Sequence, residues 1–153
     1  MGRIKYKGIK VIVDATKDLL INALQQKPFL VKPNLNELGE IFQAKLKGKR
    51  DVILYGKELQ KMGACNVLVS MAGEGAVFIG EDGQVFESFA PEGQLVNSVG
   101  AGDSMVAGFL AGYLEKQDYR YAFYMGLAAG SASAFSEGLA TNSEIEAVLK
   151  SIL

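Results

Sequence analysis

The chain has 153 residues, of which 49% are hydrophobic and 22% charged, and its formal net charge is −1. This balance is typical of a folded globular domain and excludes a disordered chain, a membrane-spanning protein and a strongly charged surface for nucleic acid or anionic lipid. The absence of His and the single Cys65 exclude a disulfide scaffold, a Cys/His zinc site and a Ser-His-Asp triad within the chain. They favour a reducing, cytoplasmic setting and leave chemistry based on carboxylates, backbone amides, lysine and hard metal ions.

The first half of the chain alternates apolar runs with amphipathic segments, after an irregular lead-in expected at residues 1–8. Apolar and β-branched runs predict buried strands at residues 10–14, 29–31 and 66–70. Between them we expect a helix over about 17–26 capped by Thr16, a short helix capped by Asn34 or Asn36, and a helix over 51–61. The first helix should bury Leu19, Leu20, Ala23 and Leu24. This order predicts an α/β layer fold with parallel strands.

The pattern changes after residue 70. Segments 76–79 and 84–87 flank the turn signal Asp82-Gly83 and predict a β-hairpin. A long helix should begin near Gly102 or Asp103, and another, rich in small residues, should run from Asp118 or Tyr119 towards Glu137, with Gly138 as its stop. Ser143 should cap a last helix over 144–153. We therefore expect one α/β domain over residues 1–153, with a mostly parallel sheet, a C-terminal hairpin and helices.

The most informative motif is Asn97 to Ser104, NSVGAGDS, where two glycines one residue apart precede a helix. Gly100 and Gly102 allow a tight turn, and the first amides of a helix have no internal partners, so the turn suits an anion such as phosphate. Asp103, in the first helical turn, could act as a general base beside it. This combination favours phosphoryl transfer to a hydroxyl. The alternative is a tight loop in which Asp103 only complements the helix dipole.

The same glycines, together with Gly108, superficially resemble a dinucleotide-binding fingerprint. That fingerprint requires a strand, a turn, a helix and a second strand that ends in an acidic residue. In this chain a helix follows the helix, and no strand is expected downstream. A dinucleotide-binding fold is therefore rejected.

A second motif, Lys32-Pro33-Asn34-Leu35-Asn36-Glu37, follows the second expected strand, at the edge where open α/β sheets bind ligands. Asn34 and Glu37 are three residues apart and would share one helix face. A carboxylate and an amide oxygen suit Mg²⁺, and Lys32 could contact nucleotide phosphates. The alternative is that Asn34 caps the helix and Glu37 lies on the surface.

A third motif, SMAGEGA over residues 70–76, begins at the end of the third expected strand. Backbone amides in this Gly-containing turn could contact a nucleotide phosphate or ribose. The alternative is a tight turn into the next strand. Cys65 is interpreted as a packed thiol, because the chain has no His that could activate it as a nucleophile.

Taken in order, these three motifs resemble those of the phosphofructokinase B family of ribokinase-like sugar kinases. Residues 96–109, VNSVGAGDSMVAGF, are similar to the family's C-terminal signature, and more narrowly to that of bacterial members acting on fructose 1-phosphate. Residues 32–37 resemble its Asn-x-x-Glu motif. Residues 69–76 resemble its nucleotide loop, in which Met71 and Ala72 replace the common Leu and Gly. The resemblance runs from about residue 9 to the C-terminus and implies the three-layer α/β/α fold of that family.

The resemblance also implies a role for each matching residue. Asp103 is expected to be the catalytic base, with Gly100, Ala101 and Gly102 as the anion hole for the transferred phosphoryl group. Asn34 and Glu37 are expected to organise Mg²⁺ and its waters. The residues expected to line the ATP site are Lys32, Asn34, Ser70, Gly73, Gly75, Asn97, Val99, Gly130 and Ser131. Some relatives also bind K⁺ near this region, and the sequence leaves its use open.

Members of this family are about twice as long, so the chain is expected to be the C-terminal, nucleotide-binding portion of the fold. The expected reaction is ATP-dependent conversion of fructose 1-phosphate to fructose 1,6-bisphosphate, with tagatose 6-phosphate as the runner-up acceptor. The alternative of another class is an inactive nucleotide-binding fragment that lacks the acceptor-sugar half. The expected partners are ATP and a phosphorylated ketohexose, without nucleic acid or membrane. Because relatives often dimerise through lid strands, the full-length enzyme could be a homodimer.

Overall fold

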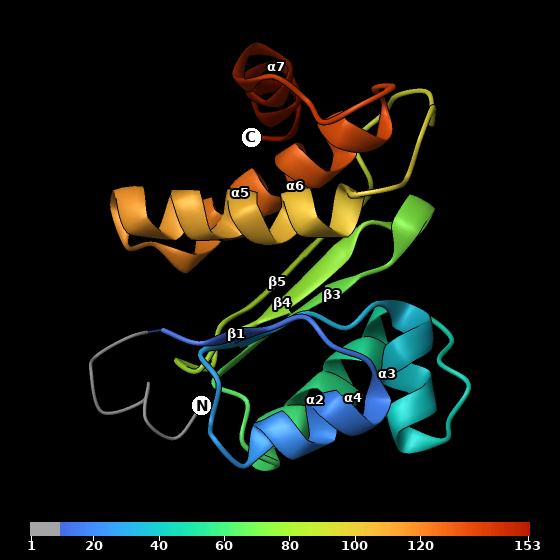
Figure 1. The fold of residues 1–153 in the computed structure, drawn as a ribbon, viewed down its shortest axis with the longest axis vertical. Helices are drawn as coiled ribbons and strands as arrows, with labels where there is room; N and C mark the ends of the chain where they lie inside the picture. Colours follow the sequence, from blue (N-terminus) through green and yellow to red (C-terminus); the bar gives the residue numbers. More distant parts are fainter. Residues whose placement is uncertain (1–9) are drawn as a thin grey trace. The chain divides into compact units, whose positions relative to one another are not determined.

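The computed structural model describes residues 10–153, so the lead-in expected at residues 1–8 lies outside the described residues. The described chain forms two compact units, whose elements are drawn in Figure 1. The first unit comprises residues 10–71 and 76–87, and the second comprises residues 72–75 and 88–153. The expectation of one domain over residues 1–153 stays a prediction.

The first unit is built on a five-stranded sheet with the strand order β1-β2-β3-β4-β5. The strands are β1 (Ile12–Val13), β2 (Leu30–Val31), β3 (Asn66–Ser70), β4 (Ala76–Ile79) and β5 (Val85–Ser88), the last of which reaches the second unit at Ser88. β1, β2 and β3 are parallel, with Leu30 opposite both Ile12 and Asn66. β4 runs antiparallel to β3. The parallel strands and the hairpin expected from the sequence are confirmed, and the complete sheet is mixed.

Three helices of the first unit, α2 (Lys17–Leu24), α3 (Leu35–Phe42) and α4 (Lys49–Lys61), lie together on one face of this sheet (Figure 1). Their apolar side chains pack with those of the strands to form the core, which includes Leu20, Leu24, Leu38, Val52, Leu59, Val67, Val69, Val77 and Ile79. The expected burial of Leu19 is wrong, since its side chain is 68% exposed. Leu20 and Leu24 share the inner face because they are four residues apart, and Leu19 is turned away from it.

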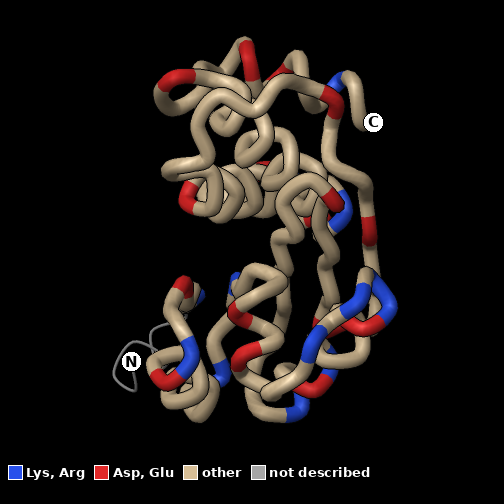
Figure 2. The backbone as a smooth tube through the Cα atoms, turned by 90° about the vertical axis from the view of Figure 1, so that its right-hand side faces the viewer, with Lys and Arg blue, Asp and Glu red and all other residues tan. Residues whose placement is uncertain are grey.

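Charged residues of both signs are intermixed along the backbone of the first unit, as Figure 2 shows. This arrangement agrees with the formal net charge of −1 for the whole chain. Within residues 10–153, none of the helices combines the length and the apolar character needed to cross a membrane.

The second unit contains the short 3₁₀ turn η1 (Ala72–Glu74) and the helices α5 (Ala101–Lys116), α6 (Tyr119–Ala134) and α7 (Asn142–Ile152). α5 and α6 pack closely because both helices bring small residues to their contact. A Cβ atom added at Gly108 would lie 2.6 Å from the Cβ of Ala129, and one added at Gly126 would lie 2.9 Å from the carbonyl oxygen of Met105. Larger side chains at these glycines would force the helices apart.

The end of α6 differs from the sequence-based expectation. The helix ends at Ala134, before Glu137 and the expected stop at Gly138. The carbonyl oxygen of Ala134 accepts hydrogen bonds from the N–H groups of Val96 and Asn97, at 2.8 and 3.0 Å. In a continuing helix, this oxygen would accept a hydrogen bond from the N–H of Gly138. Because it already accepts from Val96 and Asn97, a contact distant in sequence ends the helix.

The start of α7 also differs, because the cap is Thr141 and the expected cap at Ser143 is wrong. Thr141 and Ser143 each have a glutamate three residues later, so the spacing of a capping box does not separate them. The hydroxyl of Ser136 donates to Glu144 Oε2 at 2.6 Å, and the N–H of Glu144 donates to Thr141 Oγ1 at 3.3 Å. The bond from Ser136 holds Glu144 in the capping position and favours Thr141.

Candidate active site

Polar residues of the first unit gather at the carboxyl ends of its three parallel strands. Asp14 follows β1, Lys32 and Asn34 follow β2, and Ser70 ends β3. Asn34 pairs with Ser70 in a parallel bridge, and the N–H of Ser70 donates to the carbonyl oxygen of Pro33 at 3.3 Å. Since parallel strands present their carboxyl ends at one edge, the structure brings three predicted site residues, Lys32, Asn34 and Ser70, to the edge where such sheets bind ligands.

Asn34 and Glu37 form a complete capping box at the start of α3. The N–H of Glu37 donates to Asn34 Oδ1 at 2.8 Å, and the N–H of Asn34 donates to Glu37 Oε1 at 3.1 Å. The capping alternative is therefore confirmed. Glu37 Oε2 accepts no hydrogen bond from residues 10–153, and Asn34 is exposed. One free carboxylate oxygen beside an exposed amide fits Mg²⁺, which takes few protein ligands and keeps several waters.

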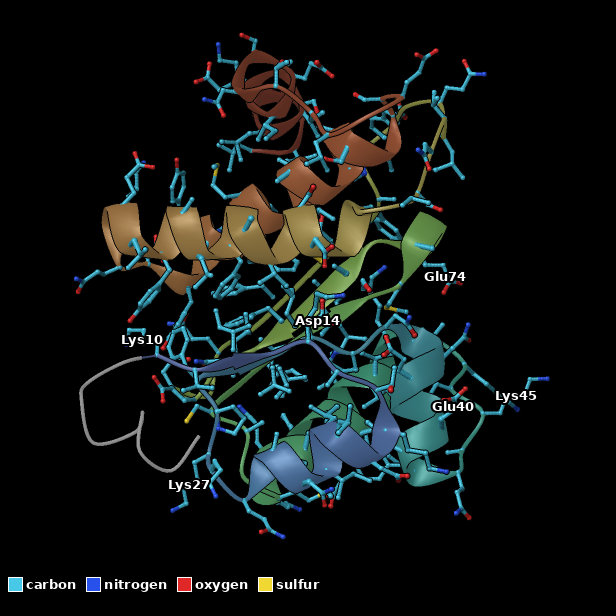
Figure 3. All side chains as sticks on the ribbon, viewed as in Figure 1. Lys10, Asp14, Lys27, Glu40, Lys45 and Glu74 are labelled. Atoms are coloured by element: carbon cyan, nitrogen blue, oxygen red, sulfur yellow. The ribbon has the colours of Figure 1, made fainter. Side chains whose placement is uncertain are left out.

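Lys32 is only 7% exposed, and its Nζ lies 3.8 Å from Asp14 Oδ1. A buried ammonium is costly without an opposite charge, so Asp14 compensates it. Asp14 lies at the end of β1 in Figure 3. The sequence interpretation did not assign Asp14 to the site. Its position directly after the first buried strand, like that of Lys32 after the second, is the signal that could have found it.

The nucleotide loop expected over residues 70–76 forms the exposed turn η1 before β4. Ala72 has φ of 47°, in the left-handed region that L-residues other than glycine rarely adopt. Gly75 has φ of 98°, and a Cβ there would collide with the carbonyl oxygen of Ser88, so packing alone requires this glycine. No atom of the described residues lies within 4 Å of a Cβ built at Gly73. Gly73 is thus the glycine of this loop that is open to a ligand.

The start of α5 has the geometry expected of an anion-binding turn. Gly100 precedes the helix with φ of 82°, and the N–H of Ser104 closes the first helical turn on the carbonyl oxygen of Gly100 at 2.9 Å. The N–H of Ala101 already donates to the carbonyl oxygen of Ser98, at 3.2 Å. The backbone N–H groups of Gly102 and Asp103 donate no hydrogen bond within residues 10–153. Two outward amides and the exposed Asp103 carboxylate therefore meet at a positive helix end.

The other predicted nucleotide residues of the second unit have different surroundings. Asn97 is held by its neighbours, because its Nδ2 donates to the carbonyl oxygen of Glu137 at 3.2 Å and its Oδ1 accepts from the N–H of Val99. Val99 is 81% exposed. Gly130 is buried against α5, where a Cβ would lie 3.1 Å from the carbonyl oxygen of Ala101, and Ser131 is half-buried. Helix packing alone accounts for Gly130.

A Gly-rich turn that opens a helix, with an aspartate in the first helical turn, has the features of a phosphate-binding site beside a carboxylate. The sequence matches the pfkB family of carbohydrate kinases over residues 4–146, so the chain belongs to this family. The ribokinase-like α/β fold expected from the sequence is thereby confirmed. This match extends across the strands, all three motifs and the helices up to the first residues of α7.

Two curated relatives are informative. The chain is 43% identical over 148 residues to 1-phosphofructokinase from Bacillus subtilis (strain 168), which covers 97% of this chain and 48% of the relative. It is 34% identical over 139 residues to D-tagatose-1-phosphate kinase from Bacillus licheniformis, which covers 90% of this chain and 45% of the relative. The chain thus spans about half the length of the curated relatives it matches.

Among solved structures, phosphofructokinase-2 from Escherichia coli in complex with potassium superposes with a TM-score of 0.87 at 29% identity, covering 95% of this chain and 48% of that one. Other crystals of the same protein contain fructose-6-phosphate or show a tetrameric inhibited form. These properties belong to the E. coli protein.

Proposed function

We propose that this chain carries the nucleotide-binding and phosphoryl-transfer machinery of an ATP-dependent sugar-phosphate kinase, with fructose 1-phosphate as the acceptor. The observation that carries the proposal is the start of α5. There a left-handed Gly100, two unpaired amides among the described residues and an exposed Asp103 carboxylate lie within one helical turn. Membership of a carbohydrate kinase family and 43% identity to a 1-phosphofructokinase support the reaction class.

In the proposed reaction, a hydroxyl oxygen of the acceptor bonds to the γ-phosphorus of ATP. The bond between that phosphorus and the β–γ bridging oxygen breaks, so that ADP leaves and fructose 1,6-bisphosphate forms. Asp103 accepts the hydroxyl proton as the new bond develops. The Gly100–Gly102 turn surrounds the moving phosphoryl group, whose negative charge the outward amides and the helix dipole stabilise.

The edge residues of the first unit would bind the nucleotide and its metal. Asn34 and Glu37 would hold Mg²⁺ through the free carboxylate oxygen, the amide and bridging waters, and the ion would neutralise phosphate charge. Lys32, whose Nζ lies 3.8 Å from Asp14 Oδ1, would bind a phosphate oxygen. Ser70, Gly73 and Gly75 would border the nucleotide, as would Asn97, Val99, Gly130 and Ser131. Binding of K⁺, which the sequence left open, is suggested by the potassium complex of the E. coli relative.

The direct test is the variant Asp103→Asn, which removes the base and keeps the shape of the side chain. We expect kcat to fall by roughly 10²–10⁴-fold, the usual contribution of general-base catalysis, while MgATP affinity stays within about twofold. The measurements are turnover with fructose 1-phosphate and calorimetric MgATP binding, both made on the full-length enzyme. The control is Asp118→Asn, in the turn before α6. Near-normal turnover of Asp103→Asn would refute the assignment of the base.

The identity of the sugar phosphate that accepts the phosphoryl group is the most specific part of the proposal. The similarity to a tagatose-1-phosphate kinase keeps phosphorylated tagatose as the alternative, with tagatose 6-phosphate as the runner-up expected from the sequence. Comparing kcat/KM for fructose 1-phosphate, fructose 6-phosphate, tagatose 1-phosphate and tagatose 6-phosphate decides between them. A clear preference for a tagatose phosphate would replace the acceptor and leave the catalytic roles intact.

A second candidate function is that of a nucleotide-binding module without kinase activity. The observation that favours it is that the chain spans 48% of its 1-phosphofructokinase relative. The assay is ATP turnover with fructose 1-phosphate by the 153-residue chain, beside calorimetric ATP binding. Binding without turnover would support the module, and robust turnover would refute it.

A further inference from the structure

Ser133 is one of the few polar side chains buried within residues 10–153, since it is only 2% exposed. It lies in the last turn of α6, where a serine hydroxyl commonly bonds to a carbonyl of its own helix. Just past the helix end, Ser136 follows this pattern, with its Oγ 2.9 Å from the carbonyl oxygen of Ala132. Ser133 instead donates to Ser104 Oγ at 2.9 Å and accepts from the N–H of Ala140 at 3.3 Å.

These two bonds join three segments of the second unit. Ser104 directly follows Asp103 and closes the first turn of α5 through its N–H bond to Gly100. Ala140 belongs to the loop over residues 135–141, which connects α6 to α7. Fixing the Ser104 side chain therefore restricts the turn that carries Asp103, while the bond to Ala140 ties that turn to the loop.

The same loop is held a second time, next to the Gly-rich turn. Asn97 Nδ2 donates to the carbonyl oxygen of Glu137, and a Cβ built at Gly100 would lie 3.3 Å from Leu139 Cδ2. The loop is thus fixed at Asn97 on one side and at Ser133 on the other, with the Gly-rich turn between. Among these contacts, the hydrogen bonds of Ser133 are the ones that connect the loop to the Ser104 side chain, next to Asp103.

We propose that Ser133 is a positioning residue of the phosphoryl-transfer site. Its hydroxyl fixes the first turn of α5 against the loop over residues 135–141 and so holds the outward amides in the geometry that binds a nucleotide phosphate. This inference rests on the proposed function, because it assigns the phosphate to that turn. It concerns a residue that would itself touch neither the nucleotide nor the acceptor.

The test compares Ser133→Ala, Ser104→Ala and the double variant with Ser136→Ala as the matched control. Ser136→Ala also deletes a hydroxyl, one that belongs to the loop itself, but within residues 10–153 its hydrogen bonds are with Ala132 of α6 and Glu144 of α7 and none is with α5. The measurements are hydrogen exchange of the Ser104 and Ala140 amides without ligand, the calorimetric Kd for MgATP, and the melting temperature of each variant.

We expect Ser133→Ala to speed exchange of both amides and to raise the Kd for MgATP by about three- to tenfold, the range that loss of one ordinary hydrogen bond gives. The double variant should raise Kd no further than the larger single effect, since both changes remove one interaction. Ser136→Ala should lower the melting temperature and leave both the Ser104 amide and Kd unchanged.

Three results would overturn the inference. Unchanged exchange of the Ser104 amide in Ser133→Ala would disprove the positioning role by itself, whether or not nucleotide binds. Additive effects on Kd in the double variant, or an equal effect of Ser136→Ala, would mean that Ser133 acts only through general stability. If the wild-type chain binds no MgATP, the proposed function fails and the phosphate-binding part of this inference fails with it, while the exchange data still report on the turn.

Discussion

Several individual residues of the candidate site have a structural requirement as well as a predicted chemical role. Lys32 is buried, and its charge is compensated by Asp14 before any ligand is considered. Gly130, expected to line the ATP site, is required by the close approach of α5. Asp103 differs from both, because it is exposed and accepts no hydrogen bond from residues 10–153. An aspartate without a structural partner at a helix start is well placed for chemistry on a ligand.

Ala72 provides a test of local backbone strain. Its φ of 47° costs an alanine roughly 1–2 kcal/mol, whereas glycine adopts this conformation freely. The gain in Ala72→Gly is partly offset by the greater freedom of glycine in the unfolded chain, about 0.5–1 kcal/mol. We therefore expect Ala72→Gly to be stabilising by up to about 1 kcal/mol in urea unfolding. The control is Ala44→Gly, at a loop position without positive φ, which should be destabilising. An equal loss of unfolding free energy in the two variants would contradict the role of backbone strain at Ala72.

At the scale of the element, α3 shows that helix capping and metal binding can use the same two side chains. Asn34 Oδ1 and Glu37 Oε1 are occupied by backbone N–H groups, which orders both side chains at the carboxyl edge of the sheet. Glu37 Oε2 stays available. The two interpretations of this motif are therefore compatible, since the cap orients the group that would bind the ion.

Substitutions can separate the two roles of this motif. Glu37→Gln keeps a capping box, because glutamine serves in that position, but removes the charge that a metal needs. We expect its unfolding free energy to change by less than about 0.5 kcal/mol, while the Mg²⁺ concentration required for ATP binding rises about tenfold. Asn34→Ala should cost about 1 kcal/mol of stability through the lost cap. Glu40→Gln, on the same helix (Figure 3), is the control and should change neither quantity.

The start of α7 predicts a pH dependence. Hydrogen bonds from Ser136 and then Thr141 lower the pKa of Glu144 below its ordinary value. Because the folded-state pKa is depressed, this stabilisation is present above the unfolded pKa of about 4.3 and is lost as pH falls through the lower folded pKa. Glu144→Gln should therefore be less stable than wild type at pH 7, and the difference should shrink below about pH 4. Urea midpoints across this range measure it, with Glu146→Gln as the control; a pH-independent difference would disprove it.

At the scale of the whole molecule, the described chain divides into two compact units, and each unit contains residues predicted for the site. Lys32, Asn34, Glu37 and Ser70 belong to the first unit, and the Gly-rich turn with Asp103 belongs to the second. The chain also spans about half the length of its curated relatives. A nucleotide that binds only the folded state would stabilise the chain against unfolding.

Ligand-induced stabilisation is the prediction at this scale. At a free MgATP concentration of 100 times Kd, the gain is about 2.7 kcal/mol, which corresponds to a rise in melting temperature of roughly 5–10 °C for a chain of this size. Differential scanning fluorimetry against MgATP concentration is the measurement. ATP with EDTA should give a smaller rise, because Glu37 then lacks its metal. No shift at any concentration would argue against nucleotide binding by this chain.

The sequence alone predicted what depends on local pattern. The apolar run at residues 66–70 coincides with β3, and the hairpin lies at the Asp82-Gly83 turn, because buried strands and tight turns have strong local signatures. The helix expected near Gly102 begins at Ala101, since adjacent glycines and a first-turn acid indicate a helix start. The family also followed from sequence, because three ordered motifs are far more specific than any one of them.

Only the tertiary structure decided the features that depend on partners distant in the chain. Val96 and Asn97 end α6 by bonding to Ala134, and Ser136 selects Thr141 over Ser143 as the cap of α7. The contact of Lys32 with Asp14 and the bond between Ser133 and Ser104 likewise join residues from separate elements. Local propensities are similar for the alternatives at these positions, so the hydrogen bonds and charges brought together by folding determine the outcome.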